Sequence, residues 1–360
     1  MRSADMTRRD FLTTVGVGVM SLNWSRWASA QEQGAPPLPG VEPSETYPET
    51  SSRLSIKDAS RFTILQLTDA HFHQRRQQMP EGDQRSIGEW KQMIDACGPD
   101  LLAITGDLWH DNFEGRGEGF MRASLSWIEE LGVPWLFAWG NHDQMDDYRV
   151  GHDAIHDAKG SLYRGGPQGG NYTVEIVRGD GSIVWELICL NTHRHGLVGP
   201  SLDWLIALAD SRRDAEPGTN AFAMFHIPIK AYADREGRET FAGITLEPVS
   251  HEKEDGSAFD RLKKLKSVRA CFCGHDHVND YSIAVDGIEM VYGRASGWCG
   301  YGFDKVRKGG KLITVNCETG RYAWETVFPE GLRWRPKQNE RVNRVLDEPW
   351  MKDPLARPAA

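Results

Sequence analysis

The sequence lacks any long apolar run. None of its apolar stretches reaches the roughly 20 residues that a membrane-spanning helix requires, so we expect no membrane span in the mature protein. Cysteine is also scarce, with six in 360 residues. A chain of this length buries enough surface to fold without covalent staples.

Basic residues are in deficit as well. Lys and Arg number 42 against 51 Asp and Glu, which gives a formal net charge of -9. Because Lys and Arg supply most contacts to nucleic-acid phosphates, a protein this acidic is a poor general nucleic-acid binder. Phosphate chemistry on this chain therefore needs a local source of positive charge, and bound metal is one such source.

The N-terminus has the layout of an export signal. Arg8 and Arg9 precede a mildly apolar stretch, and a small-residue cleavage site ends at Ala30. This order predicts a twin-arginine signal over residues 1–30, recognised by the twin-arginine export machinery, and a periplasmic or secreted mature protein. The alternative is a chance Arg pair before a short apolar helix. Because that route exports folded proteins from the reducing cytoplasm, we expect few disulfides or none.

Composition divides the remaining chain into three parts. Residues 31–60 are rich in Pro, Glu and Ser without apolar periodicity, which predicts a flexible tether. The folded domain is expected over 61–335, and the polar, Pro-bearing residues 336–360 predict a C-terminal arm. Within the domain, the charged segment 230–260 is long for a loop, and such loops are more often functional or mobile than inert.

Five short apolar runs each end at polar residues that can bind metal. They are FTILQL before Asp69 and His71, LLAIT before Asp107, PWLFAW before Asn141 and His142, AFAMF before His226, and RACFC before His275 and His277. The runs are typical of buried strands. Helical periodicity lies between them, as in residues 118–132, where Gly132 is placed to end the helix.

The alternation of strands and helices predicts an α/β fold with a largely parallel or mixed sheet. In open α/β sheets, ligands bind beyond the carboxyl ends of the strands, which is where these polar residues fall. One site is therefore expected to assemble from five loops.

Each polar fragment alone has an ordinary structural explanation, such as a turn or a core histidine bonded to backbone. The order D-x-H, G-D, G-N-H-D, H, G-H-D-H over one domain is more specific. It resembles the calcineurin-like metallophosphoesterase superfamily, over roughly Arg61 to Glu325. The segments GHDHVNDY and YGRASGWCGYG are most similar to the branch of yeast Dcr2 and the small plant purple acid phosphatases of the 28/29 type. The resemblance implies two mixed β-sheets packed face to face with flanking helices.

The resemblance also implies a binuclear metal site. In it the first metal is held by Asp69, His71 and His277, the second by Asn141, His226 and His275, and Asp107 bridges both. An anionic bridge suits the site because it offsets the repulsion between two cations. This set of donors favours Fe, Mn, Zn or Co.

The implied reaction is phosphate-ester hydrolysis by a metal-bridging hydroxide. His142 is the implied general acid for the leaving alcohol, and Asp143 or a nearby backbone carbonyl is a candidate to orient its ring. Phosphomonoesters are the first expected substrate class and phosphodiesters the second. A non-catalytic secreted metal-binding protein is a third alternative, but it has no need for His142.

Two local motifs have competing interpretations. CFCGHDH would suit a structural zinc, yet in an extended strand Cys271 and Cys273 share one face and should pack in the sheet. GDLWH places His110 where purple acid phosphatases carry the tyrosine that binds ferric iron. His71 would then replace that phenolate, and His110 would be a neighbouring group, a substrate contact or a solvated residue.

Overall fold

The structure is a computed structural model that describes residues 41–43, 50–74, 80–212, 219–234, 241–337 and 341–342. The predicted signal, residues 1–30, lies outside the described residues, as does most of the predicted C-terminal arm. No helix in the described part of the chain is both long and apolar enough to cross a membrane.

The described strands form two mixed β-sheets. The larger sheet has the order β1-β2-β6-β7-β8-β10-β12-β11-β9-β16, with bounds Val41–Pro43, Ser51–Ser55, Tyr172–Val177, Ile183–Cys189, Ala221–Met224, Val268–Cys273, Ile288–Tyr292, Asn279–Val285, Ala242–Thr245 and Arg341–Val342. The smaller sheet has the order β15-β14-β13-β3-β4-β5, with bounds Arg333–Trp334, Arg321–Val327, Gly310–Asn316, Phe62–Leu67, Leu101–Thr105 and Trp135–Ala138. All five strands predicted to precede metal-binding residues are present.

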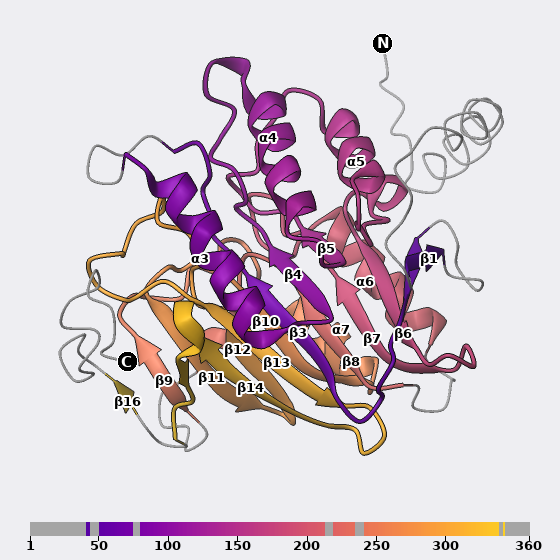
Figure 1. The fold of residues 1–360 in the computed structure, drawn as a ribbon. Helices are drawn as coiled ribbons and strands as arrows, with labels where there is room; N and C mark the ends of the chain where they lie inside the picture. Colours follow the sequence, from indigo (N-terminus) through magenta and orange to yellow (C-terminus); the bar gives the residue numbers. More distant parts are fainter. Residues whose placement is uncertain are drawn as a thin grey trace, which may run out of the picture. The chain divides into compact units, whose positions relative to one another are not determined.

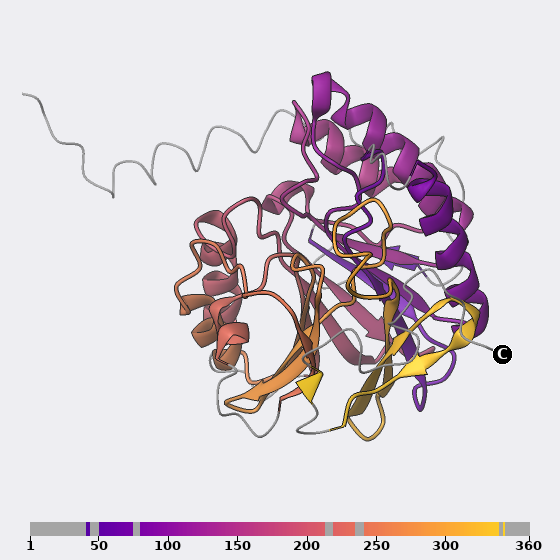
Figure 2. The same ribbon diagram turned by 90° about the vertical axis from the view of Figure 1, so that its left-hand side faces the viewer.

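Helices cover the outer faces of the two sheets (Figures 1 and 2). The helices on the smaller sheet are α3 (Gly82–Cys97), α4 (Gly117–Glu130) and α5 (Tyr148–Asp157), and those on the larger sheet are α6 (Pro200–Ser211) and α7 (Ser257–Lys264). The predicted arrangement of two packed sheets between helix layers is therefore confirmed. The predicted helix at 118–132 is α4, and Gly132 follows it with φ 69°.

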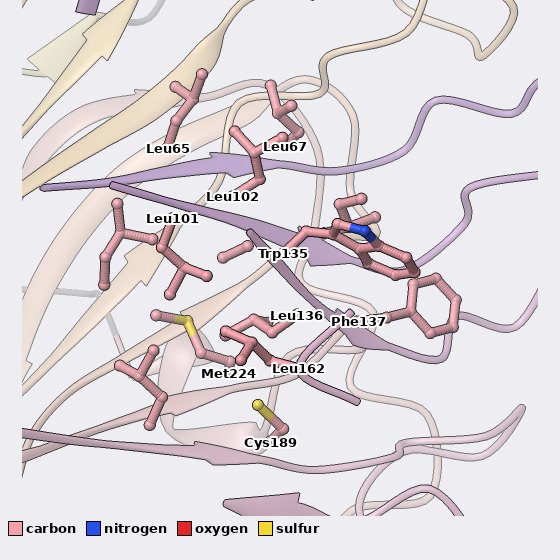
Figure 3. Close-up of a cluster of buried hydrophobic side chains, with 14 of the residues drawn as sticks. Leu65, Leu67, Leu101, Leu102, Trp135, Leu136, Phe137, Leu162, Cys189 and Met224 are labelled. Atoms are coloured by element: carbon pink, nitrogen blue, oxygen red, sulfur yellow. The ribbon is translucent and has the colours of Figure 1, made fainter. Parts of the chain in front are cut away.

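A large apolar cluster lies between the sheets, beside a buried ion pair that Lys311 of the smaller sheet forms with Asp280 of the larger sheet. Figure 3 shows Leu136 and Leu162 beside Met224 and Cys189, which come from the larger sheet. All four side chains are fully buried. Complete burial of a large apolar side chain stabilises a fold by roughly 1.5–3 kcal/mol, so this interface holds the two sheets, and the loops at their edge, in a fixed relation.

Strand register brings the polar loops to one edge of each sheet. In the smaller sheet, Leu67 lies beside Ile104, and Ile104 beside Phe137, in parallel pairs. In the larger sheet, Met224 of β8 lies beside Phe272 of β10, again in parallel. The residues that follow these strands therefore emerge side by side.

The cysteines of the CFCGHDH motif pack as the strand pattern predicts. Cys271 and Cys273 lie in the apolar cluster beneath α6 and α7, and Phe272 lies in the cluster between the sheets. Burial raises the pKa of the Cys273 thiol well above its ordinary value, so neither thiol is poised to bind a metal ion as thiolate. No disulfide is formed among the cysteines of the described residues.

The larger sheet extends beyond the range 61–335. Strand β2 lies in the predicted tether, pairs in parallel with β6, and buries Leu54 to 3% exposure. Strand β16 lies in the predicted arm and pairs with β9. The folded part therefore begins before Arg61, the start that the sequence predicted, because β2 belongs to the sheet. A single apolar residue in the Ser51–Ser55 strand is too weak a pattern to reveal it from sequence.

Candidate metal centre

The seven predicted metal ligands meet where the carboxyl edges of the two sheets adjoin. Asp69 and His71 follow β3, Asp107 follows β4, Asn141 follows β5, His226 follows β8, and His275 and His277 follow β10. These loops are separated by up to about two hundred residues of sequence, yet hydrogen bonds join them directly: the His275 N–H donates to the Asp69 carboxylate over 3.0 Å. The loops of both sheets therefore form one site.

Three of the residues form what we call the inner group, Asp69, His71 and His277. Each offers a potential ligand atom, and these atoms all lie within 4.8 Å of one another. His277 Nε2 is 3.1 Å from His71 Nε2 and 3.3 Å from Asp69 Oδ1. All three residues are buried, and His71 and His277 still line the cavity over the site.

The outer group comprises Asn141, His226 and His275. His226 Nε2 lies 3.1 Å from Asn141 Oδ1, and potential ligand atoms of Asp107, His226 and His275 lie within 4.8 Å of one another. His226 is fully buried, whereas Asn141 and His275 are partly exposed. This group is therefore the more exposed of the two, through Asn141 and His275.

Asp107 lies between the two groups. Its Oδ2 atom is 3.1 Å from His226 Nε2 in the outer group and 3.5 Å from His71 Nε2 in the inner group. A single carboxylate oxygen thus faces a nitrogen donor of each group, which is the position that a bridging ligand requires.

The backbone at the ligands is held in an uncommon conformation. Asp69, His71, Asp107 and His275 have φ angles of 56°, 48°, 52° and 82°. Positive φ is rare outside glycine, although Asp and His adopt it more readily than most residues. Such conformations persist only where surrounding structure enforces them, and they cluster at functional sites.

Two glycines allow the backbone to pass directly against the ligands. A Cβ atom on Gly140 would lie 2.2 Å from Asp107 Oδ1, and one on Gly300 would lie 2.5 Å from the His277 ring. Neither position accepts a larger residue without displacing a predicted ligand.

Asp143 orders the ligand loops and does not orient His142. Its carboxylate accepts the backbone N–H groups of Asp107, Leu108 and Gly140 over 2.7–2.8 Å. The prediction that Asp143 or a backbone carbonyl orients the His142 ring is therefore wrong. The Asp143 carboxylate points toward the backbone, where it accepts hydrogen bonds from four N–H groups.

The partner of the His142 ring is Asp111, which the sequence analysis missed. Asp111 Oδ1 lies 2.9 Å from His142 Nδ1 and also accepts the Gln144 side-chain amide over 2.6 Å. The His142 backbone N–H donates to Asp107 Oδ1 over 2.8 Å. The only sequence signal for Asp111 was its place four residues after Asp107.

A cavity of about 350 Å³ opens onto the site. Its walls include both groups through His71, His275 and His277, and it also exposes His142. The pocket residues outside the predicted set are Gln74, His110, Ser250, Glu252, Asp276, Gly300 and Tyr301. Ser250 and Glu252 belong to the charged segment 230–260, which is not one loop, because it contains β9 and the start of α7. A functional role for this segment stays a prediction.

Charges in the site are strongly coupled. Burial acts to raise the pKa of Asp107, but the nearby His226 and His71 rings hold it well below its ordinary value. The same carboxylate raises the pKa of His226 to about 10, although burial of that ring acts to lower it. Burial lowers the pKa of His71 well below its ordinary value, so this ring is neutral.

These donors fit a pair of transition-metal ions. Imidazole nitrogen and carboxylate oxygen suit Zn, Fe, Mn and Co, and two buried carboxylates, Asp69 and Asp107, supply anionic charge that cations would neutralise. Without a metal ion, a proton on the His226 ring neutralises part of this negative charge. Asp69, His71 and His277 would hold one ion, and Asn141, His226 and His275 the other, with Asp107 shared.

The structure of a dimetal phosphatase from Danio rerio has a similar fold. It superimposes with a TM-score of 0.51 at 10% sequence identity, covering 76% of this chain and 97% of that one.

Two sequence relatives carry the names of phosphatases. The probable inactive purple acid phosphatase 28 of Arabidopsis thaliana is 26% identical over 323 residues, covering 76% of this chain and 80% of its own length. The phosphatase DCR2 of Saccharomyces cerevisiae is 25% identical over 289 residues; the match covers 69% of this chain and 49% of DCR2.

The model of the calcineurin-like phosphoesterase family matches residues 62–279, which is more than half of the chain and includes all seven predicted ligands. Metallophosphoesterases of this family use a binuclear metal centre and hydrolyse phosphoric esters. This chain belongs to the calcineurin-like phosphoesterase family.

Proposed function

We propose that this chain is a binuclear-metal phosphomonoesterase in which Asp107 is the bridging ligand and His142 the proton donor. The observation that carries the proposal is the position of Asp107 Oδ2, within 3.5 Å of a nitrogen donor in each group. When bound, two ions in such a site activate water and neutralise the phosphoryl oxygens. The residues of the chain supply the remaining chemistry.

His142 is placed to protonate the leaving alcohol. Its ring lines the cavity, and its side chain is 34% exposed. Asp111 binds Nδ1 of the ring, which leaves Nε2 as the nitrogen available to a substrate. A carboxylate that holds one ring nitrogen fixes the orientation of the imidazole and stabilises its protonated form.

Hydrolysis of p-nitrophenyl phosphate and of its bis ester tests this function. The metal-loaded mature protein should release p-nitrophenol from both, faster from the monoester, and removal of metal should stop both reactions. Faster turnover of the bis ester would favour a phosphodiesterase. A protein that binds two ions and hydrolyses neither ester would be a non-catalytic metal-binding protein.

One observation favours the phosphodiesterase alternative. The Glu252 carboxylate lines the cavity and lies 3.8 Å from His275 Nε2. A fixed negative charge there opposes a phosphomonoester dianion more than a phosphodiester monoanion. The preference between phosphomonoesters and phosphodiesters therefore depends on how strongly the Glu252 carboxylate repels the substrate phosphate.

We also propose that the iron-loaded enzyme is not purple. His110 stands where the purple enzymes carry a tyrosine, and Tyr301, whose ring stacks on the His277 ring, donates its hydroxyl to Glu247 over 2.9 Å. Burial and Glu247 raise the pKa of Tyr301 above its ordinary value, although a backbone N–H opposes the shift. A strong visible tyrosinate band from the iron form would contradict this ligand set.

Residues 1–30 are proposed to be a twin-arginine signal that delivers the enzyme to the periplasm or the exterior. The support is the paired Arg8 and Arg9 before a mildly apolar run. Arg8→Lys with Arg9→Lys should leave the uncleaved precursor in the cytoplasm, as fractionation and mass would reveal. Efficient export of the double variant would indicate another route.

A further inference from the structure

His110 lies in the cavity and contacts both the inner group and the proposed proton donor. Its Nδ1 is 2.9 Å from His71 Nδ1. Its ring also stacks on the His142 ring, with centroids 4.9 Å apart and planes inclined by 15°.

The backbone fixes the relation between His110 and His71. The His71 N–H donates to Asp107 O, the Phe72 N–H to Leu108 O, and the His110 N–H to Phe72 O, all over 2.9–3.0 Å. The loops after β3 and β4 therefore run side by side like a short extension of the sheet. This backbone pairing holds His71 and His110 close enough for their rings to meet.

Hydrogen-bond geometry constrains the protons on both rings. His71 directs Nε2 toward His277 and Asp107, and Nδ1 toward His110. If Nε2 offers its lone pair to an ion, the proton of the neutral ring must lie on Nδ1. Only one proton fits between two nitrogens 2.9 Å apart, so His110 Nδ1 is the acceptor and the His110 proton lies on Nε2.

The far side of His110 suits that arrangement. His110 Nε2 lies 3.4 Å from Asp111 Oδ2, an oxygen that can accept its proton. Gln74 Nε2 lies 3.1 Å from the same ring nitrogen, so the Gln74 amide accepts that proton only after turning over to present its oxygen. Asp111 also holds His142, so one carboxylate anchors the proposed proton donor and, through His110, a proposed metal ligand.

We propose that His110 is a positioning residue that holds His71 in the tautomer with Nε2 free for the inner ion. The proposal rests on the ligand assignment of the proposed function. Histidines that bind metal generally donate their second N–H to a carboxylate, carbonyl or water, and loss of that partner typically lowers metal affinity about 10- to 100-fold. Here a second histidine takes the place of the usual partner.

Metal titration of three variants tests the proposal. His110→Ala should weaken one of the two ions about 10- to 100-fold and leave the other nearly unchanged. His110→Asn should retain most of the affinity, because the Asn amide oxygen can accept near the position of Nδ1. His156→Ala is the matched control, since His156 lies on α5 and is outside the residues that line the cavity, and it should bind both ions as the parent protein does.

A spectroscopic signal separates positioning from a general structural effect. In the zinc-loaded parent protein, the proton between His71 and His110 should give a slowly exchanging imidazole N–H resonance. That resonance should be absent from His110→Ala. These measurements need no turnover, so a parent protein that binds two ions but hydrolyses no ester would overturn the proposed function and leave this inference standing.

Two results would overturn the inference. The first is an unchanged affinity for both ions in His110→Ala. The second is a third ion in the parent protein that His110→Ala lacks, because potential ligand atoms of His71, His110 and His142 also lie within 4.8 Å of one another. If His110→Ala does not fold, His110→Asn provides the test. An affinity for one ion that falls in His110→Asn as far as the loss of a metal ligand would lower it would also contradict a positioning role for His110.

Discussion

The inner and outer groups contain similar donors but differ in their access to solvent. Asp69, His71 and His277 are 1–3% exposed, whereas Asn141 and His275 of the outer group are partly exposed. The loops after β3 and β10 and the backbone at Gly300 surround the inner group. Both groups border the cavity that also contains His142 and Glu252, the inner group through His71 and His277 and the outer group through His275. The two groups therefore differ in the exposure of their side chains and not in which of them reaches the cavity.

Replacing Asp107 should impair metal binding by both groups, because we propose that the two ions share this carboxylate. Asp107→Ala leaves two cation sites facing each other without the anion between them. We expect loss of both ions and of nearly all hydrolysis, measured by metal analysis and p-nitrophenyl phosphate turnover. Asp260→Asn, which changes an exposed carboxylate on α7, is the control. Two ions per chain in Asp107→Ala would show that the groups are independent.

Replacing His142 should lower the rate of hydrolysis without changing metal binding. His142→Ala should keep both ions and lose the proton donor, which typically contributes about 10²- to 10⁴-fold in rate. Esters with acidic leaving groups should lose least, because their alcohols depart without protonation. Turnover of a good and a poor leaving group measures this difference. An equal loss for both would mean that His142 is not the acid.

The affinity of the outer group for its ion should depend on pH more strongly than that of the inner group, because binding must release a proton. In the metal-free protein the pKa of His226 is raised from 6.5 to about 10 by Asp107, so its protonation stabilises the fold fully below pH 6.5 and progressively less as pH rises toward 10. An ion must displace that proton. Outer-ion affinity should therefore rise about tenfold per pH unit in this window.

Calorimetry in buffers of different ionisation enthalpy would count the released protons. The inner group contains His71, a neutral ring whose pKa is lowered by burial, so its ion should show a weaker pH dependence. An outer affinity that stays constant between about pH 6.5 and 8.5 would be inconsistent with the charge coupling between His226 and Asp107.

The smallest expected effect is at Glu252. Glu252→Gln removes one partly exposed negative charge from the cavity wall, which at a separation of several ångströms in water is worth about 1 kcal/mol. The ratio of monoester to diester turnover should rise about fivefold, with both ions retained. Asp260→Asn again serves as the control. Loss of the outer ion in Glu252→Gln would instead identify Glu252 as a ligand.

Much of the site was accessible from sequence because its elements are local. Each ligand follows a short apolar strand, and strand and ligand are neighbours in the chain, as in FTILQL followed by Asp69 and His71. The parallel packing of such strands then brings their carboxyl ends together. For the same reason the two cysteines of CFCGHDH could be assigned to one strand face before the structure was known.

The contacts between loops were not accessible. Asp111 and Asp143 are both acidic residues in polar loops, yet one holds the His142 ring and the other holds backbone. Glu252 reaches the cavity from a segment far along the chain. Strand β2 carried too little apolar pattern to be separated from the tether around it. In each case the partner is distant in sequence, so no local pattern records the contact.

By itself, the sequence determined which residue types stand at the strand ends, and the resemblance of those motifs to a known family implied the two-sheet fold and the seven candidate ligands. Strand periodicity and strand-end chemistry are properties of a few consecutive residues. Only the tertiary structure decided that Asp107 lies between two groups, that one group is buried throughout while the other is partly exposed, and that His110 meets His71. These facts depend on how two sheets pack and how their loops pair, because distances between loops are set by the core beneath them.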